Sequence, residues 1–99
     1  MLSNLVANYD VTYQEGYNAY LAAVGPTIVA HNGKILVAGP NSKPVGGNPG
    51  GVTVVLKFPS REVLEGWYNS SEYQGILNLR LANTAGSLVF ADEFVVRHK

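Results

Sequence analysis

Residues 58–80, FPSREVLEGWYNSSEYQGILNLR, decide the fold class of this chain. Phe58 closes an apolar run, Pro59 prevents further strand pairing, and Ser60 is a residue type that caps helices. Nine residues later, the segment 69–72 (NSSE) carries a second capping signal. The stretch therefore predicts the end of a strand, a capped helix, and a second helical segment with its own cap.

The residues at the start of the chain predict a strand followed by a helix. Polar and apolar side chains alternate in residues 4–11, which is the period of a half-buried strand. Thr12 and Glu15 have the spacing of a capping box, so we expect the helix to begin there. Apolar residues then recur at helical spacing up to Asn32-Gly33, where a left-handed residue should end the helix. Gly25-Pro26 should kink or divide this helix.

Three more strands are expected, over residues 34–39, 52–58 and 87–96. The apolar strand 52–58 is expected to be central in the sheet. Residues 40–51, PNSKPVGGNPGG, contain four glycines and three prolines and predict a flexible loop. The tail, residues 97–99, is polar and is expected to fray.

This order of elements, β-α-β-β-α-β, predicts one ferredoxin-like domain over residues 1–99. Such an α+β domain has a four-stranded antiparallel sheet with both helices on one face. The uncovered face would carry Val6, Val55, Val89 and Val95 or their alternates, depending on register. An apolar patch of this kind is unfavourable in water, so we expect a homodimer in which two sheets pack face to face.

Composition excludes several classes of function. Seven Lys and Arg balance seven Asp and Glu, so no basic surface for nucleic acid is expected. The absence of cysteine excludes disulfides, thiol catalysis and thiolate metal sites. Two distant histidines and no dense carboxylate cluster make a metal site unexpected, and no bound cofactor is expected. No segment resembles a signal peptide or a membrane span, which predicts a cytoplasmic protein that does not enter membranes.

Aromatic residues are the first candidates for a ligand pocket. Tyr17, Tyr20 and Tyr73 lie on predicted helix faces, and together with Trp67 they are many polar groups for a small core to satisfy. Trp67 and Tyr68 diverge by about 100 degrees on a helix, so they cannot both face one pocket squarely. Either Trp67 packs on the sheet with Tyr68 at its rim, or one of them forms the wall of a cleft.

Arg80 and His31 are the candidates for catalytic chemistry. Arg80 shares a helix face with Tyr73, where a guanidinium needs a partner. That partner is either an internal carboxylate (Asp10, Asp92 or Glu72) or a bound anion held by the planar fork of the arginine. His31 precedes a helix stop, where it either interacts with the helix dipole or acts as a general base.

The same residues resemble a known family. The motifs FPS at 58–60 and WYNSSEY at 67–73 with Arg80, together with Tyr17-x-x-Tyr20 and Gly25-Pro26-Thr27, are similar to the uncharacterised bacterial family labelled domain of unknown function 1330. The resemblance covers almost the whole chain and implies a dimeric α/β barrel. Family sequences tend to have an arginine in the second strand, where this chain has Val37-Ala38-Gly39. The resemblance therefore does not give the charge preference of a ligand.

Two functions are compatible with the sequence. The first, by analogy with other dimeric α/β barrels, is a small cofactor-independent enzyme acting on an aromatic or polyketide-like molecule. His31 would then be the acid or base, Arg80 would hold an anionic oxygen, and Tyr20, Trp67 and Tyr73 would shape the pocket. The second is a non-catalytic or stress-associated protein that binds a small organic ligand in the same cleft.

Overall fold

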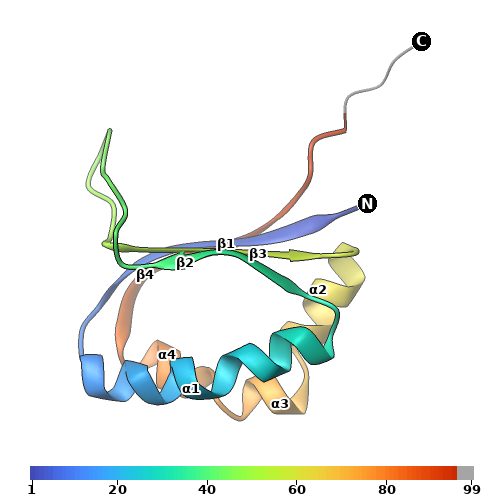
Figure 1. The fold of residues 1–99 in the computed structure, drawn as a ribbon, viewed down its shortest axis with the longest axis horizontal. Helices are drawn as coiled ribbons and strands as arrows, with labels where there is room; N and C mark the ends of the chain where they lie inside the picture. The colour runs from blue at the N-terminus through green and yellow to red at the C-terminus, as the bar shows by residue number, and fades with distance from the viewer. Residues whose placement is uncertain (96–99) are drawn as a thin grey trace.

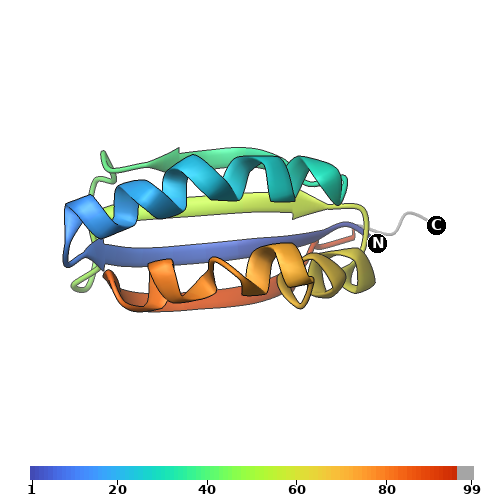
Figure 2. The same cartoon turned by 90° about the horizontal axis from the view of Figure 1, so that it is seen from below.

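The computed structural model describes residues 1–95. Their strands form one antiparallel sheet in the order β2-β3-β1-β4, so β3 is central as expected. All helices lie on one face of this sheet (Figure 1), with α1 along its β2–β3 side and the later helices along its β1–β4 side (Figure 2). The expected ferredoxin-like α+β fold is confirmed. The element bounds are β1 Ser3–Val11, α1 Gln14–Ala30, β2 Lys34–Gly39, β3 Val52–Phe58, α2 Arg61–Tyr68, α3 Ser71–Gln74, α4 Leu77–Leu81 and β4 Thr84–Asp92.

The face of the sheet toward the helices holds the core. On β1, Leu5, Ala7 and Tyr9 are buried, and they alternate with residues that face the other way. The helices contribute the largest fully buried side chains, Trp67 and Tyr73, which pack with ring centroids 4.2 Å apart. The core is therefore built where aromatic residues of the helices meet the inward side chains of the central strands.

The open face of the sheet carries a row of four valines. Val6 is paired with Val55 on one side and with Val89 on the other, and Val55 is paired in turn with Val37. The row therefore crosses all four strands and includes three of the valines named above. The β-bulge of β2 between Ile35 and Val37 brings Val37 onto this face. No helix covers the row (Figure 1).

Most of the expected helix ends are confirmed. The Ser60 and Ser70 hydroxyls accept hydrogen bonds from the backbone N–H groups of Val63 and Tyr73, so α2 and α3 have separate caps. Asn32 has φ 63°, the left-handed conformation expected at the end of α1.

Two expectations for α1 are corrected. The capping box is wrong: α1 begins at Gln14, and its N-cap Tyr13 makes no side-chain cap. The Thr12 N–H instead donates to the Asn83 carbonyl, which holds this turn against the end of α4. Of the two effects expected of Gly25-Pro26, a kink or a division, the division is wrong, because α1 continues to Ala30. Pro26 and Ala22, whose carbonyl loses its helical donor, are both exposed, so water can replace the missing bond.

The last strand is shifted from its expected bounds of 87–96. Residues 84–86 already pair with β1, and the strand ends at Asp92. Gly86 allows this early start because a side chain there would collide with the Asn8 carbonyl and Tyr9 of β1. Phe94 and Val95 follow the strand and are exposed, while Val96 and the tail 97–99 lie outside the described residues.

The loop 40–51 has no helix or strand and rises from the open face, away from the helices (Figure 1). Its base is held to β1 by the Asn8 amide, which donates to the Gly50 carbonyl (3.1 Å) and accepts from the Gly50 N–H (2.7 Å). A Cβ on Gly50 would lie only 2.4 Å from the carbonyl carbon of Tyr9. Only glycine allows this close approach of the loop to the strand.

Gly50→Ala is expected to destabilise the chain because the added methyl group collides with the backbone of β1. We expect a loss of about 1–3 kcal/mol in the free energy of unfolding, measured by urea denaturation. Gly46→Ala is the matched control, since nothing lies within 4 Å of its Cβ position. Equal stability of the two variants would contradict this account of the loop.

Candidate functional site

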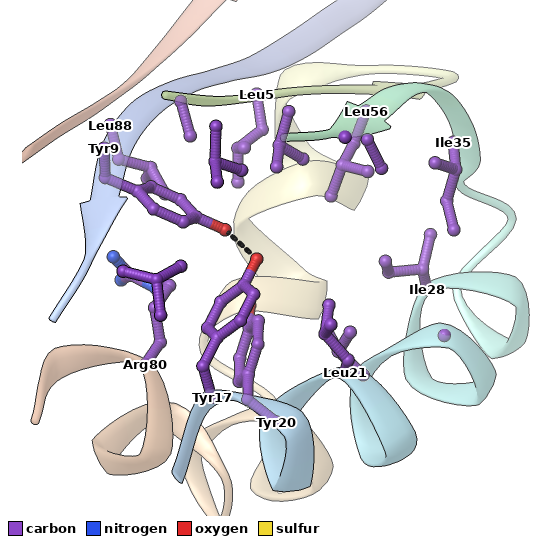
Figure 3. A pocket seen from close by; sticks show the side chains of 18 of the residues that line it. Leu5, Tyr9, Tyr17, Tyr20, Leu21, Ile28, Ile35, Leu56, Arg80 and Leu88 are labelled. Atoms are coloured by element: carbon purple, nitrogen blue, oxygen red, sulfur yellow. Dashed lines mark hydrogen bonds between the residues drawn. The ribbon is translucent and has the colours of Figure 1, made fainter. Parts of the chain in front are cut away.

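A cavity of about 320 Å³ lies between α1 and the helix-facing side of the sheet. Its floor is formed by inward residues of β1 and β3, among them Ala7, Val54 and Leu56. Leu21 on α1 and Ile35 on β2 line it and are about half exposed, which places its mouth between α1 and the edge strand β2. Figure 3 shows Arg80 and Tyr9 at the opposite end from Ile28 and Ile35. The cavity thus has one polar end and one apolar end.

Two tyrosine pairs stand at the polar end. Tyr9 on β1 and Tyr17 on α1 meet at their hydroxyl groups, 2.6 Å apart (Figure 3), and the Tyr20 and Tyr73 hydroxyls are 2.9 Å apart. Burial, and then the hydrogen bond to Tyr17, raises the pKa of Tyr9; burial, and then the charge interaction with Tyr73, raises the pKa of Tyr20. Both phenols are therefore neutral hydroxyls near pH 7, able to donate hydrogen bonds but unable to serve as ready bases.

Arg80 lines the cavity and is 8% exposed. Its Nε donates to the Tyr73 hydroxyl (3.2 Å) and its Nη2 to the Tyr68 hydroxyl (3.0 Å). Burial acts to lower the pKa of Arg80, but the interactions with Tyr73 and Tyr68 outweigh it and the net shift is upward, so the side chain remains a cation. Within residues 1–95 this buried cation has two tyrosine hydroxyl groups for partners and no carboxylate.

The three carboxylates considered as partners of Arg80 are engaged elsewhere. Asp92 pairs with Arg61 (3.1 Å), Glu72 with His31 (3.3 Å), and Asp10 accepts a hydrogen bond from the Gly51 N–H. An internal carboxylate partner for Arg80 is therefore wrong, because all three carboxylates lie at the surface or at the edge of the sheet. Phenols from α2 and α3 take their place.

Trp67 both packs on the core and lines the cavity. Its indole N–H donates to the Thr27 hydroxyl of α1 (3.0 Å), and its ring lies 5.4 Å from that of Phe58. Tyr68 is half-buried and does not line the cavity, but its hydroxyl group accepts the hydrogen bond that holds Nη2 of Arg80. The two neighbouring aromatics thus diverge as their helical spacing predicts.

His31 lies away from the other candidates. It is the C-cap of α1, its side chain is part-exposed, and its Nε2 faces the carboxylate of Glu72 on α3. Its hydrogen bond to Glu72 lowers the pKa of that carboxyl. The structure therefore brings Arg80, Tyr17, Tyr20, Trp67 and Tyr73 together at one cavity, while His31 is not among the residues that line it.

Sequence reasoning missed Tyr9 and Tyr68 as contributors to the site. Tyr9 lies in the alternating strand 4–11 on the same side as Leu5 and Ala7, so the sequence pattern indicates its inward orientation. The pattern does not indicate its hydrogen bond with Tyr17. Tyr68 was placed at a rim, and its bond to Arg80 depends on how α2 and α4 meet.

The site offers little for a metal ion. Among the described residues no group of three or more His, Asp or Glu side chains could hold one. The residues that line the cavity include one cation, several hydroxyl groups and the amide of Gln14, but no carboxylate and no histidine. The arrangement can bind and orient an oxygen atom, and it contains no conventional general base.

This fold and cavity define a ferredoxin-like α+β protein with an internal pocket between its sheet and its helices. Residues 4–94 match the model of a domain of unknown function, DUF1330, and the chain belongs to that family. The resemblance found in the sequence is thereby confirmed. Comparison with the curated proteins finds no match.

Solved structures with the same fold share little sequence. A protein of unknown function from Rhodopseudomonas palustris has a TM-score of 0.74 at 15% identity, covering 96% of this chain and 84% of that one. A candidate antibiotic biosynthesis monooxygenase from Chloroflexus aurantiacus has a TM-score of 0.60 at 10% identity, covering 99% and 98%. A dimeric ferredoxin-like protein of unknown function from Bacteroides fragilis has a TM-score of 0.57 at 11% identity, covering 93% and 96%.

In the described part of the chain no helix is both long and apolar enough to cross a membrane.

Tyr73→Phe is expected to destabilise the protein because it removes one hydroxyl that serves both Tyr20 and Arg80. Two buried polar groups would lose a partner, and we expect a loss of about 1–3 kcal/mol in the free energy of unfolding, measured with urea. Tyr13→Phe is the control, since the Tyr13 hydroxyl is exposed and donates a hydrogen bond to Glu15. It should change stability by no more than about 0.5 kcal/mol. An unchanged urea midpoint for Tyr73→Phe would argue against the buried hydrogen bonds of the Tyr73 hydroxyl.

Proposed function

We propose that this protein binds a small organic molecule in the cavity between α1 and the sheet. The observation that carries the proposal is the cavity itself, about 320 Å³ with apolar walls and a cluster of hydroxyl groups and one cation at its inner end. Ligand sites generally combine such apolar walls with a few placed polar groups, and this volume is at the lower end of their range. The candidate ligand residues are Tyr17, Tyr20, Trp67, Tyr73 and Arg80.

We also propose that the working unit is a homodimer in which two open sheet faces pack together as a dimeric α/β barrel. The support is the valine row, whose four side chains lie on the uncovered face. Val45 in the loop 40–51 and Phe94 after β4 are 92% and 89% exposed. Both segments rise from the same open face (Figure 1), where a second sheet would cover them. The Bacteroides fragilis relative is described as dimeric.

Val6→Lys is expected to separate the dimer because it places a charge in the middle of the valine row. Light scattering during size-exclusion chromatography should give the mass of two 10.6 kDa chains for the native protein and of one for the variant. Leu81→Lys is the control, since Leu81 is also apolar and exposed but lies on α4, on the helix side. A monomeric native protein would remove the dimer from the proposal.

Ala38→Phe is expected to close the cavity, because Ala38 is exposed on β2 and lines the mouth. The neutral fluorescent probe N-phenyl-1-naphthylamine should bind the native protein with a saturable rise in fluorescence. We expect the variant to bind at least about tenfold more weakly, since the aromatic ring fills space that the probe needs.

Ala22→Phe is the matched control for this exchange, because Ala22 is exposed on α1 and does not line the cavity. It should bind the probe like the native protein. Equal binding by both variants would mean that the probe binds elsewhere, and the cavity would lose its proposed role.

A second candidate is a cofactor-independent enzyme. Its support is that Arg80 and the tyrosine hydroxyls are donors that could stabilise an oxyanion. The Chloroflexus aurantiacus relative is a candidate monooxygenase, which adds an analogy of fold only. Mass spectrometry of a bound molecule before and after incubation in air would show conversion by an enzyme and no change with a binding protein.

A further inference from the structure

We propose that the ligand of this cavity is an amphipathic monocarboxylate, whose carboxylate is bound by Arg80 and whose apolar skeleton extends toward Leu21 and Ile35. This inference rests on the proposed function and names the class of molecule that the cavity takes. It comes from the charge of the inner end, the free donors there and the apolar character of the rest.

The charge at the inner end is unbalanced. Arg80 is buried as a cation, and its two hydrogen-bond partners are the hydroxyl groups of Tyr73 and Tyr68 rather than carboxylates. No residue that lines the cavity carries a negative charge. A buried charge without a counter-ion is unfavourable, whereas a bound anion would supply the missing charge in the same low-dielectric space.

Donors remain available for that anion. The Nη1 of Arg80 makes no hydrogen bond within residues 1–95, and Arg80 is one of the residues that line the cavity. The Tyr9 and Tyr17 hydroxyls share one hydrogen bond, which leaves one of the two protons free to donate. Arg80, Tyr9 and Tyr17 lie at the same end of the cavity (Figure 3). Together these groups can satisfy the two oxygens of one carboxylate.

One cation matches a monoanion better than a phosphate dianion. The lining residues include no lysine, histidine or second arginine, and Gln14 is the only amide side chain among them. A phosphate group carries up to two charges and needs more donors than this end provides. A carboxylate needs one positive charge and a small number of donors.

The remainder of the cavity selects the skeleton of the ligand. Val24 and Ile28 on α1 line it opposite the floor formed by Val54 and Leu56, and Leu21 and Ile35 lie at the mouth (Figure 3). Because Arg80 lies at the far end from the mouth, the acid enters first and the apolar part fills the space behind it. Alkyl and phenylalkyl chains have the cross-section and polarity for this space.

The test compares matched acids and alcohols on the full chain at pH 7. Octanoate and octanol form one pair, and 3-phenylpropionate and 3-phenylpropanol the other. Each is titrated against protein carrying N-phenyl-1-naphthylamine, and displacement of the probe gives the affinity. We expect at least one acid to bind about tenfold or more tightly than its alcohol, as a charge-assisted contact requires.

Arg80→Met assigns this preference to the guanidinium. We expect the variant to lose the preference for the acid while keeping its affinity for the alcohol, because the apolar walls are unchanged. Arg61→Met is the matched control: Arg61 lies on α2, pairs with Asp92 and does not line the cavity. It should keep the preference for the acid.

Three outcomes would overturn the inference. Equal binding of acid and alcohol to the native protein would show that charge plays no part, although a binding cavity would remain. An acid preference that survives in Arg80→Met would place the anion elsewhere. Failure of all four compounds to displace a bound probe would exclude this ligand class, and failure of the probe itself would count against the proposed function. If Arg80→Met does not fold, the acid and alcohol comparison on the native protein still decides the matter.

Discussion

A series of hydrogen bonds from Tyr20 through Tyr73 and Arg80 to Tyr68, part-buried at its last member, links the four helices of residues 1–95. These residues belong in turn to α1, α3, α4 and α2, and the series joins them with distances of 2.9, 3.2 and 3.0 Å. Buried polar groups must find partners, and each member here has its partner on a different helix. The position of each helix on the sheet therefore depends on the positions of the others. Their mutual positions are fixed by polar contacts, which specify geometry more narrowly than apolar packing does.

A second contact explains why a cavity exists at all. Tyr9 extends from β1 toward the helix and Tyr17 from α1 toward the sheet, and their hydroxyl groups meet end to end (Figure 3). Two tyrosines in this arrangement hold the sheet and the helix further apart than the neighbouring Ala7 and Val54 can fill. The side chains between α1 and the sheet therefore line a cavity instead of filling the space. The same pair closes the inner end of the cavity beside Arg80, so one contact both creates the pocket and supplies its polar end.

The sequence predicts the frame of this structure well and its long-range polar contacts poorly. The caps at Ser60 and Ser70 and the alternation of β1 are local signals, and they predicted two helix starts and the outward position of Val6. The predictions of a helix cap at Thr12 and of the start of β4 were wrong. Both positions depend on contacts with residues distant in the sequence, Asn83 for Thr12 and Tyr9 for Gly86. The candidates Tyr17, Tyr20, Trp67, Tyr73 and Arg80 do line one cavity. Residue types cannot show, however, that the partners of Arg80 are phenols or that α1 leaves His31 at the surface.

The alternation of β1 also separates the two surfaces on which the proposals depend. Leu5 and Ala7 face the cavity, while Val6 between them belongs to the valine row, so neighbouring residues of one strand lie on opposite sides of the sheet. The mouth of the cavity opens at the edge between α1 and β2, not through the open face. A second copy packed on the valines would therefore leave the entrance clear. Binding and association can then vary independently unless the loop 40–51, which starts at the cavity-lining Pro40 and rises toward the open face, couples them. That loop lines the cavity at Pro40 and extends on the side where the second sheet would lie.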